Sequence, residues 1–256
     1  MKERGMIFNG EMVRAILDGG KTQTRRIMKV QPEPSKSRPG DFWFSSKKLE
    51  SMVHVSDLTP GNSPISDCHL FFQELCCPFG TIGDRIWVRE TWATLGNEDG
   101  CCVDWNDNLC KGDEREAARI YRASCEQRPG DYGLWSIPDN AYWKPHTENE
   151  KFEGAWRPSI HMPRWASRIL LEITNVRVDR LNSISEQDAL SEGIDRERLE
   201  ESQDNYDCIA DHNMTGRPTA TGAFKYLWES IYGEENWQVN PWVWVIEFKR
   251  VEGGAA

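Results

Sequence analysis

The chain has 256 residues, with 41 acidic against 31 basic side chains and a net charge of -10. This length suits one elaborated domain or two small ones, and the 12 tryptophans exclude a disordered chain. No apolar run approaches the roughly 18 residues of a membrane span, and residues 1–9 lack the apolar segment of a secretory signal. The composition therefore predicts a soluble, globular, cytoplasmic protein without a membrane partner.

Charge is distributed unevenly along the sequence. Residues 1–30 carry seven basic and three acidic side chains and residues 156–180 carry five and two, whereas 92–155 carry seven and thirteen. Residues 181–235, with four basic and thirteen acidic side chains, are interpreted as solvated acidic faces. An acidic body of this kind excludes a protein that coats long nucleic acid, but it allows a local basic site for one phosphate or a short single strand.

The eight cysteines bear on metal binding and redox state. Without an export signal they are predicted to be mostly reduced thiols in loops. The alternative is a zinc site that combines Cys68, His69, Cys76 or Cys77 with the vicinal pair 101–102. Because no CxxC pair occurs, free thiols are the preferred interpretation and no metal or cofactor is expected.

The first predicted elements lie in the N-terminal third. Apolar residues at helical spacing predict a helix over 9–19, capped by Asn9. Residues 31–82 are rich in Pro, Ser and Gly and predict a long irregular excursion. The pair 83–84 then predicts a turn into a strand over 85–90, in which apolar and charged residues alternate.

The middle of the chain is less regular. Residues 94–156 are acidic and contain Cys and Trp, with one helix-like patch over 114–121. A long strand is predicted from Ile169, and its alternation changes phase after Ile173, as in a bulged strand.

The last third predicts two helices and a strand. A helix over 185–193 begins at the capping residue Ser185, and a second helix over 223–231 ends before Gly233. Residues 242–249 alternate as a strand with one strongly aromatic face. Separated strands with half-buried alternation favour a mixed barrel over a doubly wound sheet, so the predicted class is α+β with a small β-barrel and short flanking helices.

Three clusters of residues carry the candidate chemistry. The first is the run Gly-Gly-Lys-Thr-Gln-Thr-Arg-Arg over 19–26, where a helix stop places an amine, hydroxyls and guanidiniums together. Backbone N–H groups with Lys and Arg are suited to an anionic or carbonyl-bearing ligand, whereas a solvated basic turn is the alternative. The ligand-binding candidates in this run are Gly19, Gly20, Arg25 and Arg26.

The other two clusters lie further along the chain. Glu90, between Arg89 and Trp92, is either a salt-bridge partner or a general acid/base. Residues 156–165 interleave tryptophan with basic side chains, which is typical of a loop that stacks on bases or contacts phosphate. Packing of each single tryptophan in the core is the alternative. The ligand-binding candidates are Arg89, Trp92, Arg157, His161, Arg164 and Trp165.

The first cluster resembles a known family signature. Gly19, Lys21, Thr24 and Arg26 match the G-x-K-x-x-T-x-R pattern of the ASCH domain superfamily, whose members are relatives of the PUA fold. The turn at 83–84 with its following strand resembles the second motif of that family, and residues 244–248 resemble its last strand. The likeness is greatest to long ASCH-like proteins carried by phages and prophages of enteric bacteria.

The resemblance implies a single PUA-like domain over 1–256, with a core of about 1–30, 82–93 and 156–250 and insertions of about 31–81 and 94–155. It also implies binding of RNA or modified nucleotides. One bacterial branch of the family hydrolyses N4-acetylcytidine to cytidine and acetate with a Lys, a Thr and a Glu.

Those three positions correspond to Lys21, Thr24 and Glu90, which are the predicted catalytic residues. Thr24 supplies a hydroxyl, Lys21 accepts a proton, and Glu90 orients the lysine. Which of Lys21 and Thr24 attacks is left open by the sequence.

The sequence leaves three hypotheses on function. The first is a hydrolase for an N4-acylated cytidine or a related modified pyrimidine nucleoside or nucleotide. The second is a non-catalytic module that binds short RNA or a modified nucleotide. The third is a phage-encoded factor that engages a host protein through the insertion 94–156.

Overall fold

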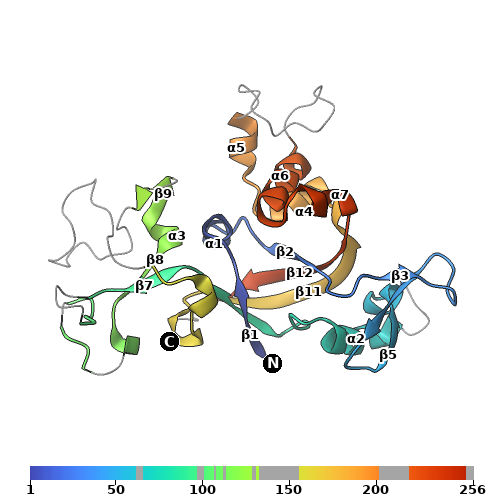
Figure 1. Ribbon diagram of the computed structural model, residues 1–256, viewed down its shortest axis with the longest axis horizontal. Coiled ribbons are helices and arrows are strands. Elements are labelled where there is room, and N and C mark those ends of the chain that lie inside the picture. Colours follow the sequence, from blue (N-terminus) through green and yellow to red (C-terminus); the bar gives the residue numbers. More distant parts are fainter. Residues whose placement is uncertain are drawn as a thin grey trace. The chain divides into compact units, whose positions relative to one another are not determined.

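The computed structural model is mixed α+β, with short helices and several separate β-sheets (Figure 1). This confirms the α+β part of the predicted fold class. The structure describes residues 1–61, 66–96, 101–106, 108–111, 114–128, 131–132, 156–201 and 219–251. Among these residues, no helix is both long enough and apolar enough to cross a membrane.

The chain divides into two compact units, which are described separately. The first unit comprises Met1–Arg4, Ala15–Ile86 and Leu171–Arg250, and the second comprises Gly5–Arg14, Trp87–Leu170 and Val251–Ala256. The predicted insertion 31–81 falls in the first unit and the predicted insertion 94–155 falls in the second.

The largest sheet has five strands in the order β1-β6-β11-β12-β2. Their bounds are β1 Glu3–Ile7, β6 Arg85–Arg89, β11 Leu170–Arg180, β12 Trp242–Arg250 and β2 Gln23–Ile27. In the described part of the chain, β1 and β2 are the edges of this sheet and do not pair with each other. The sheet is therefore open and does not form the closed barrel expected from the sequence. Alternation identifies the buried face of a strand but does not determine whether the outer strands meet.

The two longest strands agree well with the sequence. The β11–β12 register shifts between Ile173 and Asn175, which confirms the predicted bulge. Strand β12 differs from the prediction in one respect: Val243 and Val245 are as deeply buried as the aromatic residues, because β12 is a central strand covered on both faces.

Helices of the first unit form a layer beside strands β11 and β12. Helix α4 (Glu186–Ser191) is capped by Ser185, and α6 (Ala220–Tyr232) ends at Gly233, so both predicted helices are confirmed. Figure 1 shows α4, α6 and α7 grouped together. Side chains of α6 pack on β12 through Phe224, Trp228 and Val243. The remaining helices here are α5 Arg196–Glu201, α7 Glu234–Val239 and the 3-10 turn Leu181–Ser183.

Helix α1 (Gly10–Leu17) confirms the first predicted helix. The Asn9 side chain accepts a hydrogen bond from the Met12 N–H at 2.8 Å, which satisfies one free donor of the first turn. Gly19 follows with φ +80°, a conformation that favours glycine, and the helix ends there.

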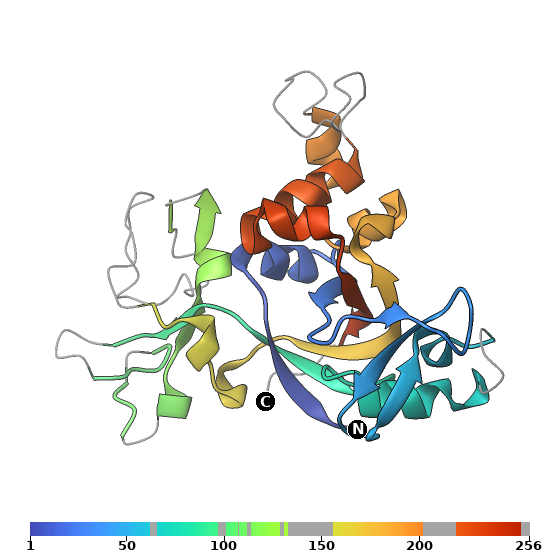
Figure 2. The same cartoon turned by 45° about the vertical axis from the view of Figure 1, so that its right-hand side comes forward.

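The segment 31–82 is more regular than predicted. It forms a three-stranded antiparallel sheet, β3-β4-β5, with a helix beside it (Figure 2). Phe44 pairs with Val53 across β4 and β5, and both are buried. The strands are two to five residues long, so no sustained period was visible in the sequence. The bounds are β3 Glu33–Pro34, β4 Phe42–Ser46, β5 Ser51–His54 and α2 His69–Cys76, with 3-10 turns Val55–Leu58 and Ser66–Cys68.

The second unit contains a two-stranded sheet in which β7 pairs with β8. The helix-like patch predicted over 114–121 is wrong at its end, since Arg119–Tyr121 is a strand. Pairing of Ile120 with Ala93 buries both side chains and overrides the helical preference of the preceding alanines. The bounds are β7 Trp92–Thr94, β8 Arg119–Tyr121, α3 Arg122–Cys125, β9 Glu126–Arg128 and β10 Asp131–Tyr132, with 3-10 turns Glu114–Glu116, Ser159–His161 and Arg164–Ala166.

Candidate functional site

Lys21 is a fully buried lysine of the first unit. It follows the turn at Gly19 and Gly20 and forms an isolated antiparallel bridge with Glu192. Its ammonium Nζ donates to Oε2 of Glu192 at 2.8 Å and to the main-chain oxygen of Glu192 at 2.6 Å. Burial lowers the pKa of Lys21, and this effect exceeds the opposing attraction of Glu192. Lys21 is thus an amine held by a carboxylate and shielded from bulk solvent.

Glu192 is a site residue that the sequence analysis missed. It lies just after α4, in the acidic stretch interpreted as solvated, yet only 3% of its surface is exposed. Its position directly before Gly193, which has φ +95°, was the available signal, because a helix stop turns the chain back toward the sheet. The solvated interpretation is therefore wrong for Glu192.

The network extends through Arg25 and Arg177. The Arg25 guanidinium donates to Glu192 at 3.1 Å and to Asp188 at 3.0 Å, and Arg177 donates to Asp188 and to Gln23. Lys21, Gln23 and Arg25 all reach this network, as expected for alternate residues on one side of a strand. The positive charge predicted to hold an anion is thus opposed here by carboxylates of the same unit.

Thr24 lies on β2 between Gln23 and Arg25. It pairs with Ile246 of β12 and is 2% exposed. Because successive side chains of a strand alternate, Thr24 and Arg26 lie on the face of β2 opposite to Gln23 and Arg25. The structure thus groups Lys21 with Arg25 and Glu192, and it places Thr24 on the other side of the strand.

Glu90 belongs to the second unit and has a different partner. Its carboxylate is 1% exposed and accepts two hydrogen bonds from the Arg168 guanidinium, both at 3.0 Å. The same guanidinium lies 4.1 Å from the ring centre of Tyr121. Burial raises the pKa of Glu90, and Arg168 opposes this. Of the two functions weighed for Glu90, the salt bridge is observed.

Among the described tryptophans of the second unit, Trp92 lies in its core and Trp165 packs against it. Trp92 is 1% exposed, with the Arg157 guanidinium 4.9 Å from its ring centre and Trp165 edge-on at 5.5 Å. The Arg89 side chain donates to the main-chain oxygens of Ser159 and Ile160. Stacking of a base on Trp92 would require displacement of the Arg157 guanidinium.

His161 and Arg164 lie on the 3-10 turns Ser159–His161 and Arg164–Ala166 of this unit. His161 ends the first turn and is exposed, while Arg164 begins the second and is half-buried. Since Lys21 and Thr24 lie in the first unit and Glu90 in the second, the proximity of Lys21 to Glu90 stays a prediction.

The described residues also bear on the metal alternative. Among them, no group of three or more His, Cys, Asp or Glu side chains is placed to hold a metal ion. None of the seven described cysteines is in a disulfide, and Cys208 lies outside the described residues. Much of the segment 94–156, predicted to contact a host protein, lies outside them as well.

Comparison with known proteins adds no relative. No family model, no curated protein and no solved structure matches the chain. The likeness to the ASCH superfamily therefore rests on the sequence motifs alone.

Proposed function

We propose that the chain is a nucleotide-directed hydrolase, an amidohydrolase for N4-acylated cytidine or a related modified pyrimidine nucleoside or nucleotide. The observation that carries this proposal is the buried Lys21 ammonium, held 2.8 Å from a carboxylate oxygen of Glu192. An ASCH-like relationship and a PUA-like arrangement of the core strands are part of the same proposal.

The chemistry of amide hydrolysis fits this pair. The step needs a base that takes a proton from the attacking hydroxyl and returns one to the leaving amine. A lysine whose pKa is lowered by burial has a larger neutral fraction near pH 7 than an exposed lysine. Glu192 then stabilises the ammonium that forms when Lys21 accepts the proton, and Arg25 orients this carboxylate through a hydrogen bond.

Thr24 takes no part in this proton transfer, because it lies on the face of β2 opposite to the Lys21 network. A water molecule therefore attacks the acyl carbon, with Lys21 as the base. A Thr24→Val variant should keep turnover, and loss of turnover in it would show that the hydroxyl attacks. Glu90 is bound by Arg168 in the second unit, and its part in catalysis stays a prediction of the family resemblance.

The test is a chromatographic turnover assay on a panel of N4-acylated cytidines and modified nucleotides. Lys21→Met and Glu192→Gln are expected to lose turnover because each removes one member of the proton-transfer pair. The matched control is Lys249→Met, which breaks a Lys–Glu pair of similar length, 2.9 Å to Glu172, with a largely exposed lysine. Full activity in Lys21→Met would reject the proposal.

A second candidate, binding of short RNA or a modified nucleotide without catalysis, is favoured by the arginines of the second unit. The guanidiniums of Arg119, Arg157 and Arg168 each lie over an aromatic ring, at 5.7, 4.9 and 4.1 Å from its centre. Stacking fixes a guanidinium in place for phosphate binding. Phosphate at Arg157 or Arg168 would have to displace the carboxylates that these residues already contact, Glu114 and Glu90 respectively.

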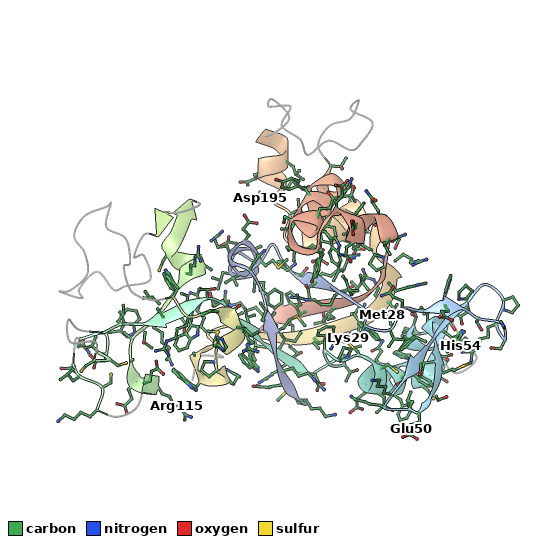
Figure 3. All side chains as sticks on the ribbon, viewed as in Figure 1. Met28, Lys29, Glu50, His54, Arg115 and Asp195 are labelled. Carbon is green, nitrogen blue, oxygen red and sulfur yellow. The ribbon has the colours of Figure 1, made fainter. Side chains whose placement is uncertain are left out.

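This candidate makes its own prediction. Binding of a short single strand should weaken as the salt concentration rises. If Arg157 contacts one phosphate, Arg157→Gln should reduce the slope of log binding constant against log salt concentration by about 0.7. Arg115→Gln, on the neighbouring exposed 3-10 turn, is the control (Figure 3 labels Arg115). If the protein shows neither turnover nor binding, the third hypothesis, a host-protein contact through 94–156, becomes the one to pursue.

A further inference from the structure

A serine, a histidine and an aspartate meet in the three-stranded part of the first unit. Ser35 follows β3, His54 ends β5, and Asp57 lies in the next 3-10 turn. Oγ of Ser35 is 2.9 Å from Nε2 of His54, and Nδ1 of His54 is 3.8 Å from Oδ2 of Asp57. Figure 3 labels His54 at this place. The hydroxyl and the carboxylate thus lie at opposite nitrogens of one imidazole.

The fold holds these groups from several directions. Arg38 binds Oδ1 of Asp57 at 2.6 Å, and its own N–H donates to Oγ of Ser35 at 3.0 Å. His54 and Asp57 are 8% and 3% exposed, whereas Ser35 is half-buried. The acid and the base are therefore inside, and the hydroxyl lies at the border with solvent.

We propose that Ser35, His54 and Asp57 form a second nucleophilic site, separate from the Lys21 network, which takes small carboxylic esters. A nucleophilic serine needs a base within hydrogen-bond reach and a group that orients that base. The 2.9 Å contact satisfies the first requirement. For the second, the Asp57 carboxylate faces the other ring nitrogen at 3.8 Å and is itself fixed by Arg38. The site requires this separation to shorten to hydrogen-bond length when the imidazole becomes protonated.

The reaction follows from these positions. His54 Nε2 takes the Ser35 hydroxyl proton while Oγ bonds to the acyl carbon. The bond from that carbon to the ester oxygen then breaks, and the departing alcohol takes the proton from Nε2. Water hydrolyses the acyl-serine in the same way, which releases the carboxylic acid and restores Ser35. No oxidant, metal or further reactant enters the balance.

Which ring nitrogen of His54 carries the proton distinguishes a nucleophilic site from a purely structural network. The Asp57 main-chain N–H is paired with the His54 side chain in a capping box, and the His54 main-chain N–H donates to the Asp57 carboxylate at 3.4 Å. If the Asp57 N–H donates to Nδ1, then Nε2 carries the proton and donates to Ser35, which leaves the serine hydroxyl without a base. The proposal requires the proton on Nδ1, directed at Asp57, with Nε2 free to accept.

Two measurements on the full chain test the proposal. Nitrogen-15 NMR of the wild-type imidazole should show His54 protonated at Nδ1, and a neutral ring protonated at Nε2 would overturn it. A fluorophosphonate probe followed by peptide mass spectrometry should modify Ser35. Labelling should fall at least tenfold in His54→Gln and in Asp57→Asn, and no labelling of wild-type Ser35 would also overturn the proposal.

Matched variants complete the design. Ser37→Ala removes the neighbouring hydroxyl, 3.3 Å from the same Nε2, and should leave Ser35 labelling unchanged. Ser35→Ala should abolish it, and circular dichroism checks that each variant is folded. Lys21→Met should keep full labelling, so failure of the amidohydrolase proposal and failure of this one are distinguishable.

Discussion

Nζ of Lys21 lies 2.8 Å from Oε2 of Glu192, although the two residues are 171 positions apart in the chain. One comes from the turn after α1 and the other from the turn after α4. Both side chains are almost fully excluded from solvent. Removal of charges from water is costly unless they are paired, so this contact couples the two turns and fixes the position of the amine.

Lys21→Met should destabilise the protein by about 3–5 kcal/mol, because it leaves a buried carboxylate without its ammonium partner. Urea unfolding measures the change. The double variant Lys21→Met/Glu192→Gln should recover part of the loss, since position 192 then carries no charge and Arg25 keeps its other partner, Asp188. Lys249→Met, at a pair whose lysine is 63% exposed, should have little effect. Equal effects of Lys21→Met and Lys249→Met would contradict the burial argument.

Gly193→Ala should destabilise the same site by about 1–3 kcal/mol. Gly193 has φ +95°, and an added Cβ would lie 2.9 Å from Cβ of Ala15 and 3.1 Å from Cβ of Lys21. Gly20→Ala is the control, because the nearest atom to its added Cβ is 3.8 Å away. Thermal unfolding of both variants checks this, and a Gly193→Ala protein as stable as Gly20→Ala would count against the close packing.

Asp84 should contribute stability that disappears in acid. Burial alone would raise its pKa, but hydrogen bonds from the Lys2 N–H at 2.7 Å and from Arg4 at 2.9 Å outweigh this and hold the pKa below the ordinary value. The unfolded chain therefore binds the proton more readily. The contribution is complete above the unfolded pKa of about 3.9 and is lost as pH falls through the lower folded pKa.

Asp84→Asn tests whether the Asp84 carboxylate causes stability to fall as pH falls. The variant should lose about 1–3 kcal/mol near pH 7, since a charged acceptor of several hydrogen bonds is removed. Its free energy of unfolding should also change less than that of the wild type between about pH 6 and pH 2. An acid dependence identical to that of the wild type would show that the Asp84 carboxylate is not specifically stabilised.

Cys77 should resist alkylation in the folded protein. Burial raises the pKa of its thiol to about 12, so almost no thiolate is present near pH 8. Cys68 and Cys101 are exposed and should react with iodoacetamide much sooner. Peptide mass spectrometry after a timed reaction gives the order, and urea should remove the difference. Modification of Cys77 as fast as Cys68 in the native protein would be the contrary result.

Elements with a clear period or cap could be predicted from the sequence. The helix capped by Asn9, the strand containing Ile86 and Val88, and the bulge after Ile173 all depend on local patterns. The sheet of β3, β4 and β5 could not be predicted, because strands of a few residues carry too little alternation.

Only the basic residues of the candidate site could be predicted from the sequence. Lys21 and Arg25 stand in a recognisable run, whereas their partner Glu192 is one of thirteen acidic residues over 181–235. Its function depends on a contact 171 positions away in sequence, and no local pattern identifies such a contact. The same holds for Ser35 and His54, which lie 19 positions apart and meet through the pairing of β3 with β4 and of β4 with β5.

The proposed base also predicts a pH dependence of turnover. Only the neutral amine of Lys21 accepts a proton, so the rate should rise with pH through a pKa below the ordinary 10.5. In Glu192→Gln the carboxylate that favours the ammonium is lost, and the residual rate should rise at lower pH than in the wild type. If Glu192→Gln left the dependence of turnover rate on pH unchanged, the Glu192 carboxylate would have no part in the reaction.

Release of cytidine and acetate from N4-acetylcytidine, compared between the wild-type protein and Lys21→Met at equal folded concentration, tests the proposed hydrolase activity. We expect turnover by the wild type, a fall of about 10²–10⁴-fold in Lys21→Met, and no change in Lys249→Met. Absence of turnover by the wild type across the N4-acylated panel, or equal turnover by Lys21→Met, would contradict the proposal.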